Sequence, residues 1–185
     1  MINETKKKNI FYSGVGSRET PIEICNLMTK IACKLEQNSK NTEYDYILRS
    51  GRAIGADKAF EKGIKNAKNK CIYTIENFDF SSENYEMCKF EILSVLDSNI
   101  NFDNYGKNAQ ILILRDVNQV LGSKNTNLEK SKFLICWTKH SNYYAKPPNA
   151  CGGTRFAVRI ALKHGIPVFN LLIKEDRERI EKFLS

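Results

Sequence analysis

Three short glycine-containing segments carry residue types that could bind a phosphate group. They are "GVGSRETP" from Gly14, "SGRAIGAD" from Ser50 and "GGTR" from Gly152, and each precedes a stretch with helical spacing. The start of a helix presents unpaired N–H groups and a partial positive charge, which favour an anion. Glycine lets the backbone approach a ligand closely, and arginine can hold a phosphate through two parallel hydrogen bonds. The segments therefore predict a phosphate site, with Arg18 as a clamp and Ser17 and Thr154 as hydroxyl donors.

Alternating strand and helix patterns must position these segments. Apolar runs predict strands at residues 9–15, 44–50, 70–75, 132–138 and 166–172, and helical spacing dominates between them. Thr20 is expected to cap the first helix, with Pro21 in its first turn, and Gly122 to end a later helix. This order predicts an α/β fold, with a mainly parallel sheet of about five or more strands and helices on both faces.

The predicted site lies at the carboxyl edge of that sheet, where ligands bind in open parallel sheets. Each glycine segment alone is more typical of an ordinary turn, but three of them at one edge favour a ligand. The segment "WTKHSN", which contains Thr138, reaches the same edge. The pattern is not a Walker loop, since no GK[ST] follows, and "GVGSRE" lacks the third glycine of the dinucleotide fingerprint.

Composition sets the wider limits. The 185 residues predict a single domain, preceded by a flexible tail at residues 1–8. No apolar run approaches the roughly 20 residues needed to span a bilayer, and no secretory signal is present, so a cytoplasmic protein without a membrane partner is expected. The net charge of +8 favours anionic partners, although lysines spread along the chain are equally typical of a solvated surface. The six cysteines show no metal-binding spacing, so reduced core cysteines, no metal and no cofactor are expected.

Several residues have two interpretations. Asp57 either favours the dipole of its helix or accepts hydrogen bonds from ribose hydroxyls, and it is the candidate catalytic carboxylate. Trp137 either stacks on a base or belongs to the core. Arg115, Asp116 and Gln119 either lie on the exposed face of an amphipathic helix or contribute to the site. The two histidines, His140 and His164, look incidental.

These motifs, together with "RDVNQVLG", "FLICWT" and "GGTRFAVRIALKHGIPVFNL", resemble the SLOG superfamily, which includes DprA/Smf proteins, YpsA-like proteins and LOG phosphoribohydrolases. The chain looks most similar to short single-domain DprA-like proteins of bacteriophages, over about residues 10 to 172. The resemblance implies a Rossmann-like sheet, a nucleotide-type ligand and a homodimer. Matched by position, it implies a ligand site that includes Gly14, Gly16, Ser17, Arg18, Ser50, Gly51, Gly55, Asp57, Arg115, Gln119, Gly152, Gly153 and Thr154.

The chain departs from the superfamily pattern at three positions. Arg52 and Arg155 stand where glycine is usual, and Asp116 stands where asparagine is usual. The two arginines are included in the predicted ligand site, where they either strengthen anion binding or block the pocket. LOG enzymes carry acidic residues after the glycine turn, whereas "RFAVR" follows it here, which disfavours LOG-type hydrolysis.

Three functions follow from this sequence. The first is binding of a nucleotide or a derivative such as an ADP-ribose-like signal, which a phage protein in the host cytoplasm could sense or sequester. The second is single-stranded DNA binding in recombination, supported by the basic charge. The third is hydrolysis or transfer at a nucleotide N-glycosidic bond, for which Asp57 is the acid placed at the sheet edge and Asp116 is a possible second acid.

Overall fold

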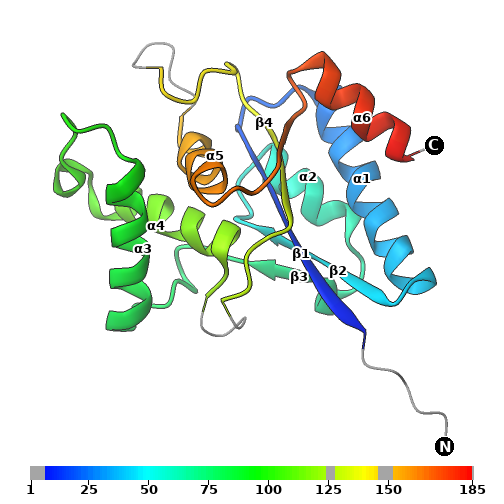
Figure 1. The fold of residues 1–185 in the computed structure, drawn as a ribbon, viewed down its shortest axis with the longest axis horizontal. Helices are drawn as coiled ribbons and strands as arrows, with labels where there is room; N and C mark the ends of the chain where they lie inside the picture. Colours follow the sequence, from blue (N-terminus) through cyan, green and yellow to red (C-terminus); the bar gives the residue numbers. More distant parts are fainter. Residues whose placement is uncertain (1–6, 124–127, 146–151, 185) are drawn as a thin grey trace, which may run out of the picture.

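One parallel sheet organises the chain (Figure 1). The computed structural model describes residues 7–123, 128–145 and 152–184. Within them, five strands pair in the order β3-β2-β1-β4-β5. The strands are β1 (Lys8–Gly16), β2 (Tyr44–Ser50), β3 (Lys70–Ile72), β4 (Phe133–Trp137) and β5 (Val168–Asn170). From β1 the chain adds β2 and β3 on one side of the sheet and then β4 and β5 on the other. The loops that follow the neighbouring strands β1 and β4 therefore lead to opposite faces of the sheet and leave room for a ligand between them.

Helices cover both faces of this sheet, which confirms the predicted α/β, doubly wound arrangement. Figure 1 shows α1, α2 and α6 on one face and α3, α4 and α5 on the other. The helices are α1 (Ile22–Asn41), α2 (Ala56–Gly63), α3 (Ser82–Val95), α4 (Lys107–Leu121), α5 (Thr154–Lys163) and α6 (Lys174–Leu184). Two short 3-10 turns, η1 (Ala67–Asn69) and η2 (Phe102–Asn104), were not predicted.

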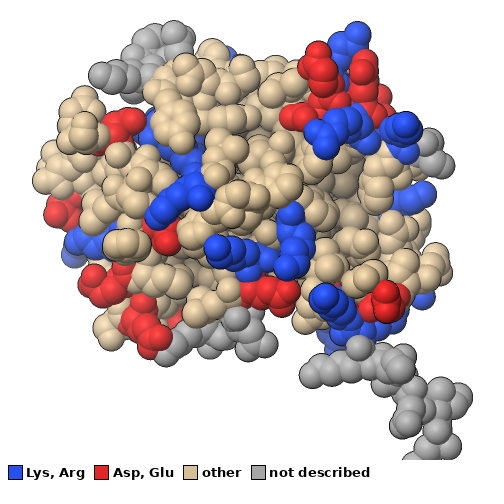
Figure 2. All heavy atoms as spheres, in the orientation of Figure 1, with Lys and Arg blue, Asp and Glu red and all other residues tan. Residues whose placement is uncertain are grey.

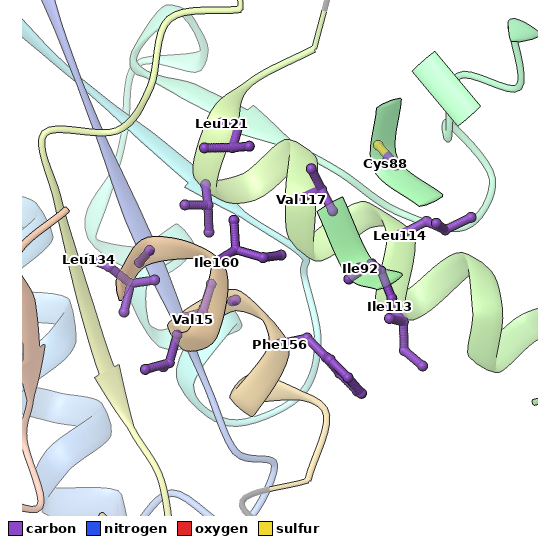
Figure 3. Close-up of a cluster of buried hydrophobic side chains, with 14 of the residues drawn as sticks. Val15, Cys88, Ile92, Ile113, Leu114, Val117, Leu121, Leu134, Phe156 and Ile160 are labelled. Carbon is purple, nitrogen blue, oxygen red and sulfur yellow. The ribbon is translucent and has the colours of Figure 1, made fainter. Parts of the chain in front are cut away.

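Alternation along the strands separates two hydrophobic cores. In β4, Leu134 and Cys136 pack with α3, α4 and α5, whereas Ile135 and Trp137 pack with α1, α2 and α6. Successive side chains of a strand point to opposite faces, so β1 and β4 each contribute to both cores. Figure 3 shows the first core, in which α5 lies next to Val15 and Leu134, and Cys88 and Ile92 of α3 pack beside α4. Trp137 is therefore a core residue.

Element boundaries differ from the sequence-based expectation in a few places. The predicted cap at Thr20 is wrong: α1 begins at Ile22, and the Thr20 hydroxyl donates instead to the Ser17 carbonyl oxygen at 2.6 Å. The Thr20 hydroxyl therefore closes the turn after β1 and is not available to cap α1. Gly122 does end α4, with a φ of 84°. The edge strands β3 and β5 are shorter than the predicted runs at 70–75 and 166–172, because each pairs on one side only.

The remaining expectations concern the chain as a whole. Residues 1–6 of the predicted tail lie outside the described residues, and Lys8 pairs with Tyr44 at the start of β1. The five described cysteines form no disulfide bond with one another, and Cys151 lies outside this set. In the part of the chain that the structure describes, no helix is both long and apolar enough to cross a membrane.

Candidate functional site

A cleft of about 890 Å³ opens beyond the carboxyl end of β1. The loops that follow β1, β2 and β4 form its sides together with α4 and the start of α5. Its lining residues are Gly16, Ser17, Arg18, Glu19, Ala53, Asp57, Tyr105, Ala109, Leu112, Ile113, Arg115, Asp116, Gln119, Lys139, His140, Gly152, Gly153, Thr154, Arg155 and Phe156. The glycine segments predicted to share a site therefore do meet at one place.

The predicted ligand residues fall into two groups. Those that line the cleft are Gly16, Ser17, Arg18, Asp57, Arg115, Gln119, Gly152, Gly153, Thr154 and Arg155. Those that do not line it are Gly14, Ser50, Gly51, Arg52, Gly55 and Thr138. In the second group, Arg52 is turned toward Glu61, whereas the other five residues hold or pack the loops and strand ends next to the cleft.

The first two glycine segments pack against each other. A Cβ atom at Gly16 would lie 2.6 Å from the Ala56 Cβ, and one at Gly55, whose φ is +89°, would lie 2.5 Å from the Ser17 carbonyl oxygen. Gly14 similarly faces the ring of Phe60. These glycines are therefore required because protein atoms approach closely, which sequence alone cannot distinguish from the approach of a ligand.

The third glycine segment is open. A Cβ atom at Gly152 or Gly153 would have nothing within 4 Å among the described residues, and Gly152 has a φ of +62°. Gly153 precedes the first residue of α5, and no side chain of the described residues caps this helix. Within that part of the chain, the N–H groups at the start of α5 therefore lie beside the cleft without a side-chain acceptor.

Buried hydroxyl groups hold the ends of the strands. The Ser50 hydroxyl donates to the Gly14 carbonyl oxygen at 2.6 Å. The Thr138 hydroxyl donates to the His140 carbonyl oxygen at 2.6 Å and accepts from Asn170 Nδ2 at 3.0 Å. Both residues position loops of the cleft rather than line it.

The two arginines at unusual positions behave differently. Arg52 is turned toward Glu61, to which its Nε and Nη2 atoms donate at 3.1 and 2.8 Å, and its side chain is 53% exposed. Arg155 lines the cleft, with its guanidinium carbon 4.8 Å from the centre of the Phe156 ring. The Arg155 Nε atom is buried and has no hydrogen-bond partner among the described residues. Arg52 therefore neither builds nor blocks the cleft, whereas Arg155 contributes an unpaired donor.

Asp57 joins the first two loops. The residue is 3% exposed, and its Oδ2 atom accepts from the backbone N–H groups of Gly51 at 3.1 Å and Ala53 at 3.3 Å. Burial raises the pKa of Asp57 to about 6, against the opposing effects of the Arg115 charge and of backbone N–H groups that include that of Gly16. The carboxylate thus stabilises the loop geometry and also faces the cleft.

Asp116 brings a second carboxyl group into the cleft. Burial, reinforced by the charge of Asp57, raises the pKa of Asp116 to about 8, whereas Arg115 and a hydrogen bond from Gln119 lower it. That hydrogen bond joins Gln119 Nε2 to Asp116 Oδ1 at 3.2 Å. The expectation of an exposed helix face is wrong here: Arg115, Asp116 and Gln119 are 9%, 8% and 1% exposed. The reason is that α4 packs against α3, α5 and the sheet, so more than one of its faces is covered.

Arg115 lies between the two carboxyl groups and the loop after β2. Its Nη1 atom donates to the carbonyl oxygens of Gly51 at 2.6 Å and Tyr73 at 3.3 Å. A Cβ atom at Gly51 would lie 2.7 Å from the Arg115 Cζ, so glycine is required for the guanidinium to fit. The Arg115 Nε atom is buried without a hydrogen-bond partner among the described residues.

No protein-family model, curated protein or solved structure matches the chain. The resemblance to the SLOG superfamily therefore stays a prediction that rests on the motifs.

Sequence reasoning missed several residues of the cleft. Lys139 and Glu19 form an ion pair at 3.4 Å that connects the loops after β4 and β1, and His140 lies beside them. Asp116 was left with two interpretations, although its spacing of three residues from Gln119 places both on one side of a helix. The segment "WTKHSN" was expected at this edge, but no pattern distinguishes Lys139 within it, and none marks the apolar wall, which includes Leu112. Within the described residues, no cluster of histidine, cysteine or acidic side chains could hold a metal ion.

Proposed function

We propose that the cleft binds a nucleotide or a nucleotide derivative through its phosphate groups. The observation that carries this proposal is the buried, unpaired Nε of Arg155 beside the open glycines at the uncapped start of α5. A buried donor without a partner lowers the stability of the folded protein. A ligand atom that accepts a hydrogen bond at this point would therefore stabilise the protein and gain affinity for itself. Arg18 adds positive charge to the lining of the same cleft.

The rest of the lining suits the other parts of a nucleotide. Tyr105, Leu112, Ile113 and Phe156 supply an apolar and aromatic wall for a base. The carboxyl groups of Asp57 and Asp116 can accept or donate hydrogen bonds with ribose hydroxyls. The cleft volume of about 890 Å³ lies within the usual range for small-molecule sites.

Titration calorimetry with AMP, ADP, NAD, ADP-ribose and its cyclic form tests this proposal. We expect Arg155→Ala to weaken binding by about tenfold or more, because it removes a charge-assisted hydrogen bond. Arg52→Ala is the matched control, since Arg52 is paired with Glu61 outside the cleft, and it should change the affinity by less than about twofold. Absence of binding by the unmodified protein across the panel would overturn the proposal.

A second candidate function is cleavage of a nucleotide N-glycosidic bond. The position of Asp116 favours it, because a second acid lies beside Asp57 although none follows the glycine turn. A pKa of about 6 for Asp57 and of about 8 for Asp116 leaves one group ionised and the other protonated near pH 7. Release of adenine from AMP, followed by chromatography and abolished in Asp57→Asn, would support this activity; no release above the uncatalysed rate would exclude it for AMP.

Single-stranded DNA binding has less support. On the face shown in Figure 2, basic side chains are separated and mixed with acidic ones, most clearly over α6. A groove that follows a nucleic-acid backbone is instead lined by a continuous basic surface with stacking aromatic residues. We therefore favour the small ligand.

A further inference from the structure

The feature that the proposed function leaves unexplained is the presence of two carboxyl groups in an anion-binding cleft. Asp57 and Asp116 both line it. When either carboxyl group is ionised, its negative charge repels the other carboxylate and would also repel a phosphate ligand. A site built for anions would be weakened by two carboxylates. It would be improved if one of them stayed neutral.

We propose that Asp116 contacts the ligand as a neutral carboxylic acid and donates a hydrogen bond to it, so that binding depends on a proton held at this position. The inference rests on the proposed function, because it concerns the ligand of the same cleft. It assigns Asp116 as a binding residue and predicts that its ionisation switches the site off.

The hydrogen bonds around Asp116 leave one oxygen for this role. Its Oδ1 atom accepts from Gln119 Nε2, and this is the one hydrogen bond that its side chain makes within the described residues. Gln119 is itself held, because the hydroxyl of Ser13 donates to its backbone oxygen at 2.8 Å. The other oxygen of Asp116 accepts no hydrogen bond within the described residues, and because Asp116 lines the cleft, a protonated carboxyl group can present an O–H donor there.

The backbone N–H donors nearby serve Asp57 rather than Asp116, whereas the charge of Arg115 acts on both. Asp57 has backbone N–H donors from three residues in addition to the charge of Arg115. The Arg115 Nη1 atom is already engaged with the carbonyl oxygens of Gly51 and Tyr73. Asp57 is therefore the carboxyl that ionises first, and its negative charge then helps to keep the proton on Asp116.

Other titratable or charged groups around Asp116 belong to the remaining walls of the cleft. They are Arg18 and Glu19 after β1, Tyr105 before α4, Lys139 and His140 after β4, and Arg155 on α5. Glu19 is paired with Lys139, so its charge is largely neutralised. Histidine is the other residue class that ordinarily changes charge between pH 5 and 8, which makes His140 the group to control for.

The test is the affinity for AMP between pH 7.0 and 9.5, where the phosphate group is already fully ionised because its second pKa is about 6. We expect binding to the unmodified protein to weaken above about pH 8, approaching tenfold per pH unit, because one proton must be recovered. Asp116→Asn keeps the shape and an N–H donor but cannot ionise. The affinity of this variant for AMP should therefore change by less than about threefold between pH 7.0 and 9.5. His140→Gln should retain the steep dependence.

The possible outcomes separate the two proposals. A flat profile for the unmodified protein, an equally steep profile for Asp116→Asn, or a profile flattened by His140→Gln would each overturn the inference and leave nucleotide binding intact. No binding of any nucleotide at pH 7 would overturn the proposed function, and the inference with it. A second measurement needs no variant: calorimetry at pH 8 in HEPES and in Tris should detect uptake of about half a proton per AMP bound, and zero uptake would overturn the inference.

Discussion

At the scale of single residues, Arg115 links the candidate site to stability. Replacement by methionine keeps the apolar stem but removes the donors to Gly51 and the counter-charge of two buried carboxyl groups. We expect Arg115→Met to lower the free energy of unfolding by about 3 kcal/mol or more at pH 8, because an unpaired buried charge remains. Urea unfolding followed by circular dichroism measures this change.

Two comparisons make that prediction specific. Arg52→Met removes an arginine whose ion pair with Glu61 is on the surface, so the free energy of unfolding should fall by less than about 1 kcal/mol. At pH 5, where Asp57 and Asp116 bind protons, the deficit of Arg115→Met should shrink. An equal deficit at both pH values would show that lost packing, not lost charge, explains the effect.

The residue types of the site were partly predictable. Asp57, Arg115, Gln119 and the residues after Gly152 were placed correctly in one cleft, because each follows a strand end or belongs to a recognisable motif. The sequence left two interpretations open for Asp116, because the pattern of α4 resembles that of a helix with one exposed face. Only the tertiary packing of α4 against several elements shows that its polar residues are buried.

At the scale of elements, the loops after β1 and β2 behave as one packed unit. Gly55 has a φ of +89°, and an added Cβ would lie 2.5 Å from the Ser17 carbonyl oxygen. Gly55→Ala combines left-handed backbone strain with a backbone clash, so we expect it to lower the free energy of unfolding by about 3 kcal/mol. Thermal unfolding of the variant measures the loss.

Gly165 provides the matched control, because its φ is +66° and nothing in the described residues lies within 4 Å of an added Cβ. Gly165→Ala should therefore cost only the strain of about 1 kcal/mol. Similar losses for the two variants would mean that the loops after β1 and β2 can separate without penalty. Such a result would also remove the reason to treat their glycines as packing residues.

At the scale of the whole molecule, the sheet was predictable and its edges were not. Central strands carry continuous apolar runs because both faces are buried, so β1, β2 and β4 were located closely. The edge strands β3 and β5 end earlier than their apolar runs, because only one neighbour offers backbone partners. The convergence of separate loops into one cleft follows from the parallel order, whereas the size and lining of the cleft depend on side chains that no strand pattern specifies.

The buried carboxyl groups also make the stability of the whole molecule depend on pH. An aspartate in an unfolded chain has a pKa of about 4, whereas the folded protein raises that of Asp57 to about 6 and that of Asp116 to about 8. Between these limits the folded state binds more protons than the unfolded state, so raising the pH lowers the free energy of unfolding. The stabilisation that comes from the protons bound by these two carboxyl groups is complete below about pH 4 and is lost as the pH rises through 8.

We therefore expect the free energy of unfolding to fall from pH 6 to pH 8 by up to about 1.4 kcal/mol per pH unit, mainly because of Asp116. Asp116→Asn cannot ionise, so its free energy of unfolding should be nearly constant over this interval and should exceed that of the unmodified protein at pH 9. Urea unfolding at pH 6, 7, 8 and 9 compares the two slopes. Parallel slopes would mean that Asp116 is already ionised in the folded protein at pH 6, which would contradict both this prediction and the neutral hydrogen-bond donor assigned to the cleft.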